Sequence, residues 1–137
     1  MLIKITNTAR DYAWGSRTLI SDYFGTQPTG QPMAEIWFGT HESSMASDLE
    51  DSTKSLLELR GQRPLSFLLK ILAADSPLSI QAHPNAALAA QLHASRPDLY
   101  KDGNHKPEMA VALTPFDVLC SFRSPLDGAA HLRRAPE

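Results

Sequence analysis

The stretch AEIWFGTH, residues 34–41, decides the fold class that the sequence predicts. It is rich in aromatic and β-branched residues, which favour the pleated surface of a β-strand. Residues 2–6 alternate weakly and predict a first strand, and residues 44–49 are a candidate partner for the strand at 34–41. The run FLLKIL, residues 67–72, is short and apolar and lies between prolines, so it predicts a buried strand.

Three more strands and several short helices are expected along the chain. The strands cover residues 78–83, 106–113 and 116–122. The helices cover residues 17–24, 52–59, 85–95 and a last segment that begins at 124. Ser or Asn caps the last three, with Pro after the cap of the final one, and Gly or Pro follows the first three. Since long alternation of parallel strands and helices is not apparent, the sequence predicts a mainly β fold, an antiparallel sandwich or barrel with short helices.

Composition limits the class of protein. The 137 residues are one ordinary domain in length, and with 42% apolar and 20% charged residues the chain can form a packed core. The net charge of −2 offers no basic excess for a phosphate backbone, so nucleic acid is not an expected partner.

Cysteine usage and the apolar runs indicate a cytoplasmic protein with no membrane partner. The single cysteine, Cys120, is expected to be a buried structural thiol, and one cysteine fits a reducing compartment. The first residues lack a secretory leader. The longest apolar stretch, residues 67–74, is interrupted by Lys70 and is too short to span a bilayer.

Polar side chains share one face of the expected strand at 78–83. Because successive side chains of a strand alternate between faces, Ser79, Gln81 and His83 lie on one side, with apolar residues behind them. Such a face is also typical of a solvent-exposed amphipathic strand, so both interpretations stay open at this point.

A second polar face belongs to the expected strand at 106–113, where alanines follow Lys106 and Glu108. Small residues beyond a charged pair are typical of a face that looks into a barrel. If the two polar faces meet, Gln81, His83 and Glu108 converge. Imidazole, amide and carboxylate donors suit Zn²⁺, with Mn²⁺ and Fe²⁺ as alternatives.

Lys70 interrupts an otherwise apolar strand. Lysine is rarely buried without a partner. Its ammonium either extends to solvent from a strand edge or holds an anionic group of a substrate, and the residues alone leave both open.

Five motifs, in one order along the chain, resemble the type I mannose-6-phosphate isomerases, a family of zinc-dependent cupins. They are YAWG at 12–15, AEIWFGTH at 34–41, FLLKIL at 67–72, PLSIQAHP at 77–84 and NHKPEM at 104–109.

The resemblance implies an antiparallel cupin jelly roll that interconverts mannose 6-phosphate and fructose 6-phosphate through an enediol. It also implies site residues. They are the zinc ligands Gln81, His83 and Glu108, Lys106 beside the metal, Ser79 and Lys70 near the substrate phosphate, and Trp14 and His41 in the pocket. For the proton transfer itself, His41 and Lys106 are our acid or base candidates.

The chain also departs from the family pattern. Family members are roughly two or three times as long, on a domain-scale estimate, and the family's fourth zinc ligand lies downstream of the matching region. Residues 1–137 are therefore expected to be the N-terminal part of the catalytic cupin domain, with an incomplete jelly roll. An alternative is a shortened cupin that binds metal or sugar phosphate without catalysis. Exposed sheet edges would leave self-association open.

Overall fold

A computed structural model describes residues 2–119 and 121–134. The chain divides at the Gln81–Ala82 bond into two compact units, which we call unit 1 (through Gln81) and unit 2 (from Ala82) and describe separately. The thiol expected at Cys120 lies outside the described residues. None of the helices in the described part of the chain is both long and apolar enough to cross a membrane.

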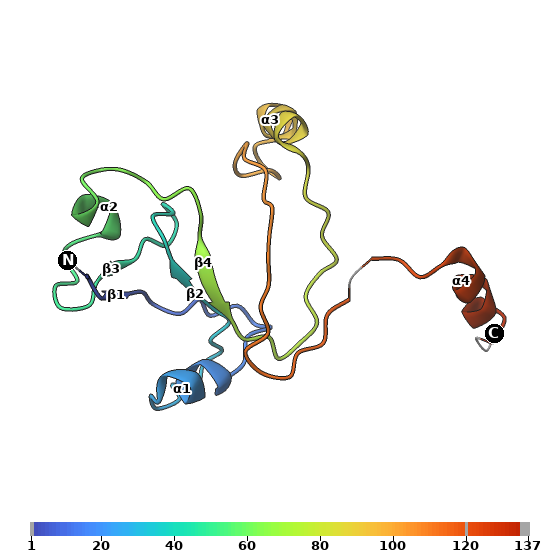
Figure 1. The fold of residues 1–137 in the computed structure, drawn as a ribbon, viewed down its shortest axis with the longest axis horizontal. Helices are drawn as coiled ribbons and strands as arrows, with labels where there is room; N and C mark the ends of the chain where they lie inside the picture. Colours follow the sequence, from blue (N-terminus) through green and yellow to red (C-terminus); the bar gives the residue numbers. More distant parts are fainter. Residues whose placement is uncertain (1, 120, 135–137) are drawn as a thin grey trace. The chain divides into compact units, whose positions relative to one another are not determined.

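Unit 1 contains two small antiparallel sheets (Figure 1). Strand β1 (Ile5–Thr6) pairs with β3 (Ser47–Asp48), and β2 (Glu35–Phe38) pairs with β4 (Leu69–Leu72). The strands expected near residues 2–6, 34–41 and 67–72 are therefore confirmed. The segment at 44–49 pairs with β1 instead of β2, so its expected partner was wrong.

The core of unit 1 lies where β2, the end of β4 and α1 (Leu19–Phe24) meet. Ile20, Ile36 and Ala73 are buried together there, and Met33 and Phe38 pack against them. Helix α1 ends at Gly25, whose φ of +65° is the left-handed conformation that glycine adopts at low cost. The helix expected over 17–24 is confirmed, with a later start.

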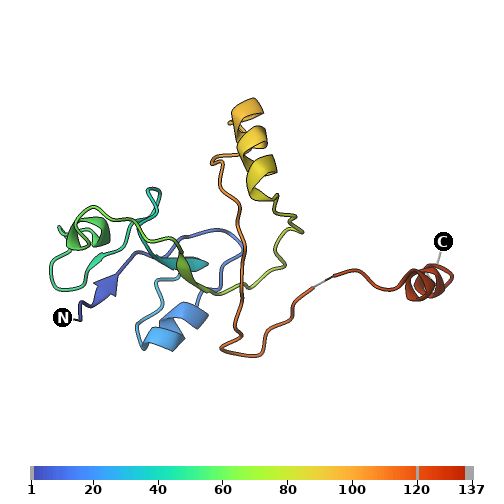
Figure 2. The ribbon, with the colours of Figure 1, turned by 45° about the horizontal axis from the view of Figure 1, so that its top comes forward.

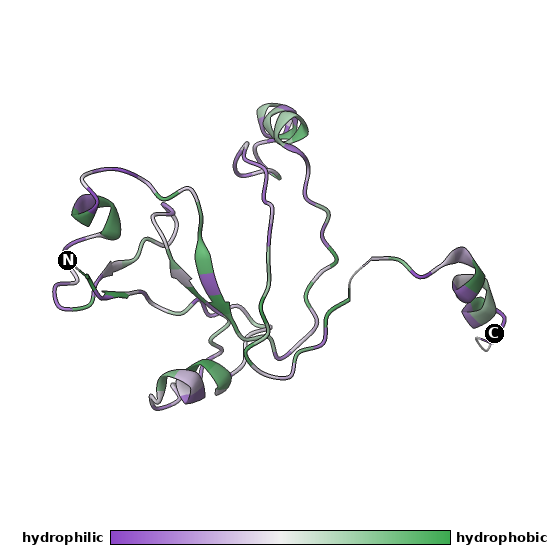
Figure 3. Cartoon of the chain, viewed as in Figure 1, coloured by the Kyte–Doolittle hydropathy of each residue, from purple (hydrophilic) through white to green (hydrophobic). Residues whose placement is uncertain are grey.

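Strand β4 was expected to be buried, and this was wrong for part of its surface. Leu69 and Leu72 are 58% and 39% exposed. Figure 3 shows the strand as apolar at both ends with a hydrophilic interruption, which is Lys70 in the sequence. Among the described residues the strand pairs with β2 alone, and Ile71 is its one partly buried residue.

Helix α2 (Leu56–Leu59) begins three residues later than expected, because Ser55 rather than Ser52 caps it. The Ser55 hydroxyl accepts from the Glu58 backbone N–H, and the Ser55 N–H donates to the Glu58 carboxylate, which forms a reciprocal capping box. The Ser55 hydroxyl and N–H together hold the pKa of Glu58 below its ordinary value.

Unit 2 contains α3 (Ala86–Ser95) and α4 (Pro125–Leu132), and both confirm the expected caps. The side chains of Asn85 and Ser124 accept the backbone N–H groups of Leu88 and Asp127. The loop after α3 folds back along the helix (Figure 2), where His93 Nδ1 lies 2.7 Å from the Tyr100 carbonyl oxygen.

The three strands expected at 78–83, 106–113 and 116–122 are not formed in the part of the chain that the structure describes. Residues 78–83, 106–113, 116–119 and 121–122 lie in no helix or strand. Ile80 and Met109, which were expected on core faces, are 94% and 91% exposed. Alternation determines which side chains share a face, but a strand also needs a hydrogen-bonded neighbour, and no described segment pairs with these.

Gly15 is a close-approach position, because a Cβ there would lie 2.6 Å from the backbone of Ala34. We predict that Gly15→Ala lowers the free energy of unfolding of unit 1 by about 1–3 kcal/mol, since backbone must move to admit the methyl group. Denaturant unfolding followed by the fluorescence of Trp14 and Trp37 measures this. Gly128→Ala is the matched control, because nothing lies within 4 Å of its new methyl group. An unchanged midpoint in Gly15→Ala would contradict the prediction.

Candidate active site

Trp14 is held by backbone pairing to the chain that follows β4. The Ser16 N–H donates to the Ala73 carbonyl and the Asp75 N–H donates to the Trp14 carbonyl, each at 2.8 Å. Its indole ring stacks on Tyr12 with ring centroids 5.6 Å apart. The close approach at Gly15 lets this loop lie against β2. The structure thus places an aromatic pair at the end of the β2–β4 sheet where β2 begins and β4 ends.

His41 follows β2, and its imidazole meets Trp37 edge-on at 5.1 Å between ring centroids. The backbone N–H of Ser43 donates to His41 Nδ1 at 3.2 Å. A backbone N–H can only donate, so Nδ1 is the acceptor and the proton of the neutral ring lies on Nε2. His41 therefore offers an N–H donor to a ligand, not a second free acceptor.

Lys70 stands directly opposite Trp37 in the β2–β4 pairing. Its ammonium lies 4.3 Å from the centroid of the Trp37 ring, within the range of a cation–π interaction. It also lies 3.7 Å from a carboxylate oxygen of Glu35. The Lys70 side chain is 35% exposed, so the ammonium is partnered and still reaches solvent.

Ser79 and Gln81 occupy the last residues of unit 1, and their side chains lie on the same side of the backbone. The amide nitrogen of Gln81 donates to the Ser79 hydroxyl at 2.9 Å. The amide oxygen of Gln81, the atom that would bind a metal, accepts no hydrogen bond among the described residues.

His83 and Glu108 are brought together in unit 2, although 25 residues separate them. His83 Nε2 lies 3.0 Å from a Glu108 carboxylate oxygen. Two ligand atoms of one tetrahedral zinc ion lie about 3.3 Å apart, from bond lengths of about 2.0–2.1 Å. These two atoms therefore have the chemistry and nearly the separation of neighbouring ligands, and the pair fits a borderline divalent ion.

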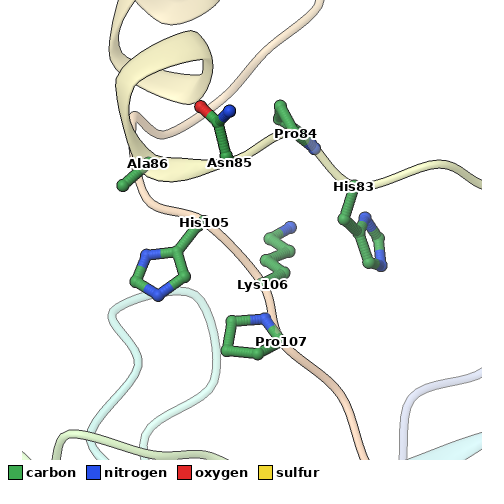
Figure 4. A pocket seen from close by; sticks show the side chains of 7 residues that line it. All are labelled: His83, Pro84, Asn85, Ala86, His105, Lys106 and Pro107. Carbon is green, nitrogen blue, oxygen red and sulfur yellow. The ribbon is translucent and has the colours of Figure 1, made fainter.

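Lys106 lines an open hollow of about 330 Å³ in unit 2, together with residues of the 83–86 and 105–107 segments. In Figure 4 its side chain extends between those of His83 and His105, towards Pro84 and Asn85. Its ammonium lies 4.0 Å from an Asp102 carboxylate oxygen, a weak exposed pair. Lys106 is thus available to a molecule in the hollow.

The candidate residues are divided between the two units. Unit 1 holds five of them and unit 2 holds three. In the described ranges, no group of three or more His, Cys, Asp or Glu side chains is placed so that it could hold a metal ion. The unit 1 residues are Trp14, His41, Lys70, Ser79 and Gln81, and those of unit 2 are His83, Lys106 and Glu108.

Two charged residues at this site were missed by the sequence interpretation, Glu35 and Arg10. Glu35 is buried in β2, and its carboxylate accepts the Trp37 indole N–H at 2.7 Å. The guanidinium of Arg10 lies over the rings of Trp37 and Tyr12, at 4.9 and 5.3 Å from their centroids. A charged residue inside an apolar strand was the available signal for Glu35, as it was for Lys70.

Comparison with known proteins decides the family. A model of the family described as phosphomannose isomerase type I, catalytic domain, matches residues 2–125. The chain belongs to this family.

Relatives are spread over animals, plants and bacteria. The chain is 39% identical to human mannose-6-phosphate isomerase, over 93% of this chain and 36% of the human protein. It is 40% identical to mannose-6-phosphate isomerase 1 of Arabidopsis thaliana, over 99% of this chain and 37% of that protein. The chain spans about a third of the length of these phosphomannose isomerase relatives.

The structure is also similar to solved phosphomannose isomerases. The crystal structure of mannose 6-phosphate isomerase from Salmonella typhimurium, bound to its substrate fructose 6-phosphate and zinc, has a TM-score of 0.65 and 32% identity to this chain. That match covers 76% of this chain and 33% of the Salmonella chain. A second structure, of an isomerase bound with zinc and yttrium, has a TM-score of 0.65 at 31% identity.

The Ser43 contact predicts one tautomer of His41. In ¹H–¹⁵N correlation spectra recorded where the ring is neutral, we expect its proton on Nε2. His93 is an internal control, because its Nδ1 faces a carbonyl oxygen, which can only accept, and should carry the proton on Nδ1. A neutral His41 with its proton on Nδ1 would contradict the observed geometry.

Proposed function

We propose that this chain is the N-terminal part of the catalytic cupin domain of an enzyme that interconverts mannose 6-phosphate and fructose 6-phosphate. One observation carries the proposal: two residues with zinc-ligand chemistry, His83 and Glu108, meet at 3.0 Å within the range matched by the family's catalytic domain. The likeness to isomerases of known structure supports an antiparallel jelly roll, of which the two small sheets of unit 1 would form a part.

We propose Gln81, His83 and Glu108 as ligands of one zinc ion. The contact between His83 and Glu108 and the donor types support this assignment. The choice of Gln81 rests on the sequence motif and on its amide oxygen, which accepts no hydrogen bond from the residues that the structure describes. When bound, zinc would act as a Lewis acid that stabilises negative charge on the sugar oxygens. The zinc named in related crystal structures fits this donor set.

The phosphate end of the sugar is assigned to Lys70 and Ser79. Lys70 supplies a partly exposed ammonium and Ser79 a hydroxyl, which are common donors to phosphate oxygens. Trp14 presents an aromatic surface on a loop that backbone hydrogen bonds hold in place. Together these residues would bind and orient the substrate, which is a small molecule and not a macromolecule.

Proton transfer is assigned to Lys106 and His41. In the direction from mannose 6-phosphate, a base removes the proton on C2 while the oxygen on C1 gains a proton, which gives the enediol. The base then returns its proton to C1 while the hydroxyl on C2 loses its proton, which gives fructose 6-phosphate. Because the His41 proton lies on Nε2, His41 suits the role of donor to a sugar oxygen. Lys106, in its neutral form, is then the candidate base.

We also propose a cytoplasmic location, which the single cysteine supports. Self-association through exposed sheet edges stays a prediction. The apolar side chains of Met109, Val111 and Leu113, which lie in no strand and are each more than 60% exposed, offer a further apolar surface for it.

Lys106→Met in the full-length protein tests the proposed reaction. We predict that kcat falls about 10²–10⁴-fold, the usual contribution of one acid–base group, while the zinc content measured by plasma mass spectrometry is unchanged. Lys101→Met, an exposed lysine of the same unit, is the matched control and should retain activity.

The unmodified full-length protein decides the wider proposal in the same assay. Conversion of mannose 6-phosphate with stoichiometric zinc supports the isomerase. Zinc or sugar phosphate binding without conversion would instead support a binding protein, and full activity in Lys106→Met would remove the role given to Lys106.

A further inference from the structure

Glu35 is a buried carboxylate that the proposed reaction does not use. It is only 7% exposed, and burying a carboxylate costs free energy unless its oxygens are partnered. One oxygen accepts the Trp37 indole N–H at 2.7 Å, and the other lies 3.7 Å from the Lys70 ammonium. Both oxygens are therefore directed at groups on the same face of the β2–β4 sheet.

The strand register explains why these three side chains meet. Trp37 is paired with Lys70 across the two strands, and Glu35 precedes Trp37 by two residues, so it shares the face of Trp37. Glu35 and the Trp37 ring contact the ammonium of Lys70 from two directions. An ammonium has three donor hydrogens, so one direction remains for a ligand.

Arg10 braces the same indole ring and has its own hydrogen-bond acceptors. Its Nε donates to the Tyr12 hydroxyl at 3.0 Å, and a terminal nitrogen donates to the Ser43 carbonyl at 2.9 Å. Its guanidinium lies 4.9 Å from the Trp37 ring centroid. Arg10 therefore braces the ring on which Lys70 rests, and the side chain of Lys70, 35% exposed, is open to a ligand.

We infer that Glu35 is a positioning residue for Lys70, which holds its ammonium where it meets the phosphate group of the sugar. The inference rests on the proposed function, in which Lys70 binds that phosphate. Glu35 does not touch the substrate in this role. It limits the lysine to one place on the Trp37 ring, so less conformational freedom is lost when the phosphate binds. Glu35 should therefore affect substrate binding and leave the proton-transfer step alone.

A purely structural role for the buried pair makes a different prediction, and a double-mutant cycle separates the two. Glu35→Gln keeps the shape of the side chain and an oxygen that accepts the Trp37 N–H, and it removes the charge that faces Lys70. In the zinc-loaded full-length protein we expect KM for mannose 6-phosphate to rise about tenfold, about 1.4 kcal/mol, with kcat within about twofold. With Lys70→Met already present, Glu35→Gln should change KM no further.

The opposite results would overturn the inference. Equal KM increases from Glu35→Gln with and without Lys70 would show that Glu35 acts independently of the lysine, and so would a fall in kcat at unchanged KM. Glu50→Gln, which removes an exposed carboxylate of unit 1, is the matched control and should leave KM unchanged. If Glu35→Gln does not fold, the same cycle is run with Glu35→Asp, which keeps the charge and shortens its reach.

A binding measurement distinguishes failure of this inference from failure of the proposed function. Inorganic phosphate is titrated into the same proteins while the indole N–H resonance of Trp37 is followed, with Trp14 as the second reporter. We expect Glu35→Gln to raise the Kd for phosphate about as much as it raises KM. If the protein converts no sugar phosphate but this Kd still rises, the positioning role stands without the isomerase. An unchanged Kd overturns the positioning role whatever the turnover.

Discussion

The pairing of β2 with β4 is the constraint on which the candidate site of unit 1 depends. It places Trp37 opposite Lys70 and brings Glu35 onto the same face. It also extends beyond the strands, since the Ala73 N–H donates to the Ala34 carbonyl and the next residues hold the Trp14 loop. One antiparallel ladder thus orients an ammonium, two tryptophans and a buried carboxylate.

Unit 2 depends on a single side-chain contact for its chemistry. His83 and Glu108 lie on segments that form no strand in the described chain, and their 3.0 Å contact is what marks a site there. Lys106 extends from the second of these segments into the hollow beside His83 (Figure 4). The two segments contribute the proposed ligand pair and the proposed base, a combination suited to metal-assisted proton transfer.

Local chemistry made most of the helices and the strands β2 and β4 predictable, but not the pairing of these two strands with each other. The caps at Asn85 and Ser124 and the glycine at the end of α1 act within a few residues, so the sequence reveals them directly. The prediction of strands over 78–83 and 106–113 was wrong, because alternation of side chains does not reveal whether a neighbouring strand is present to pair with. The pairing of β3 with β1 was missed for a related reason, since it depends on backbone contacts between distant segments.

Candidate site residues could be named from the sequence where a polar group interrupts an apolar pattern, as Lys70 does. Glu35 has the same signature within AEIWFGTH, but its role depends on the register with β4, which only the structure gives. The central claim is that His83 and Glu108 bind one metal ion together with Gln81. Anomalous diffraction at the zinc edge, from crystals of the zinc-loaded full-length protein, tests it most directly. The account predicts one peak about 2.0–2.2 Å from His83 Nε2, a Glu108 oxygen and the Gln81 amide oxygen. Stoichiometric zinc bound away from His83 and Glu108 would contradict it.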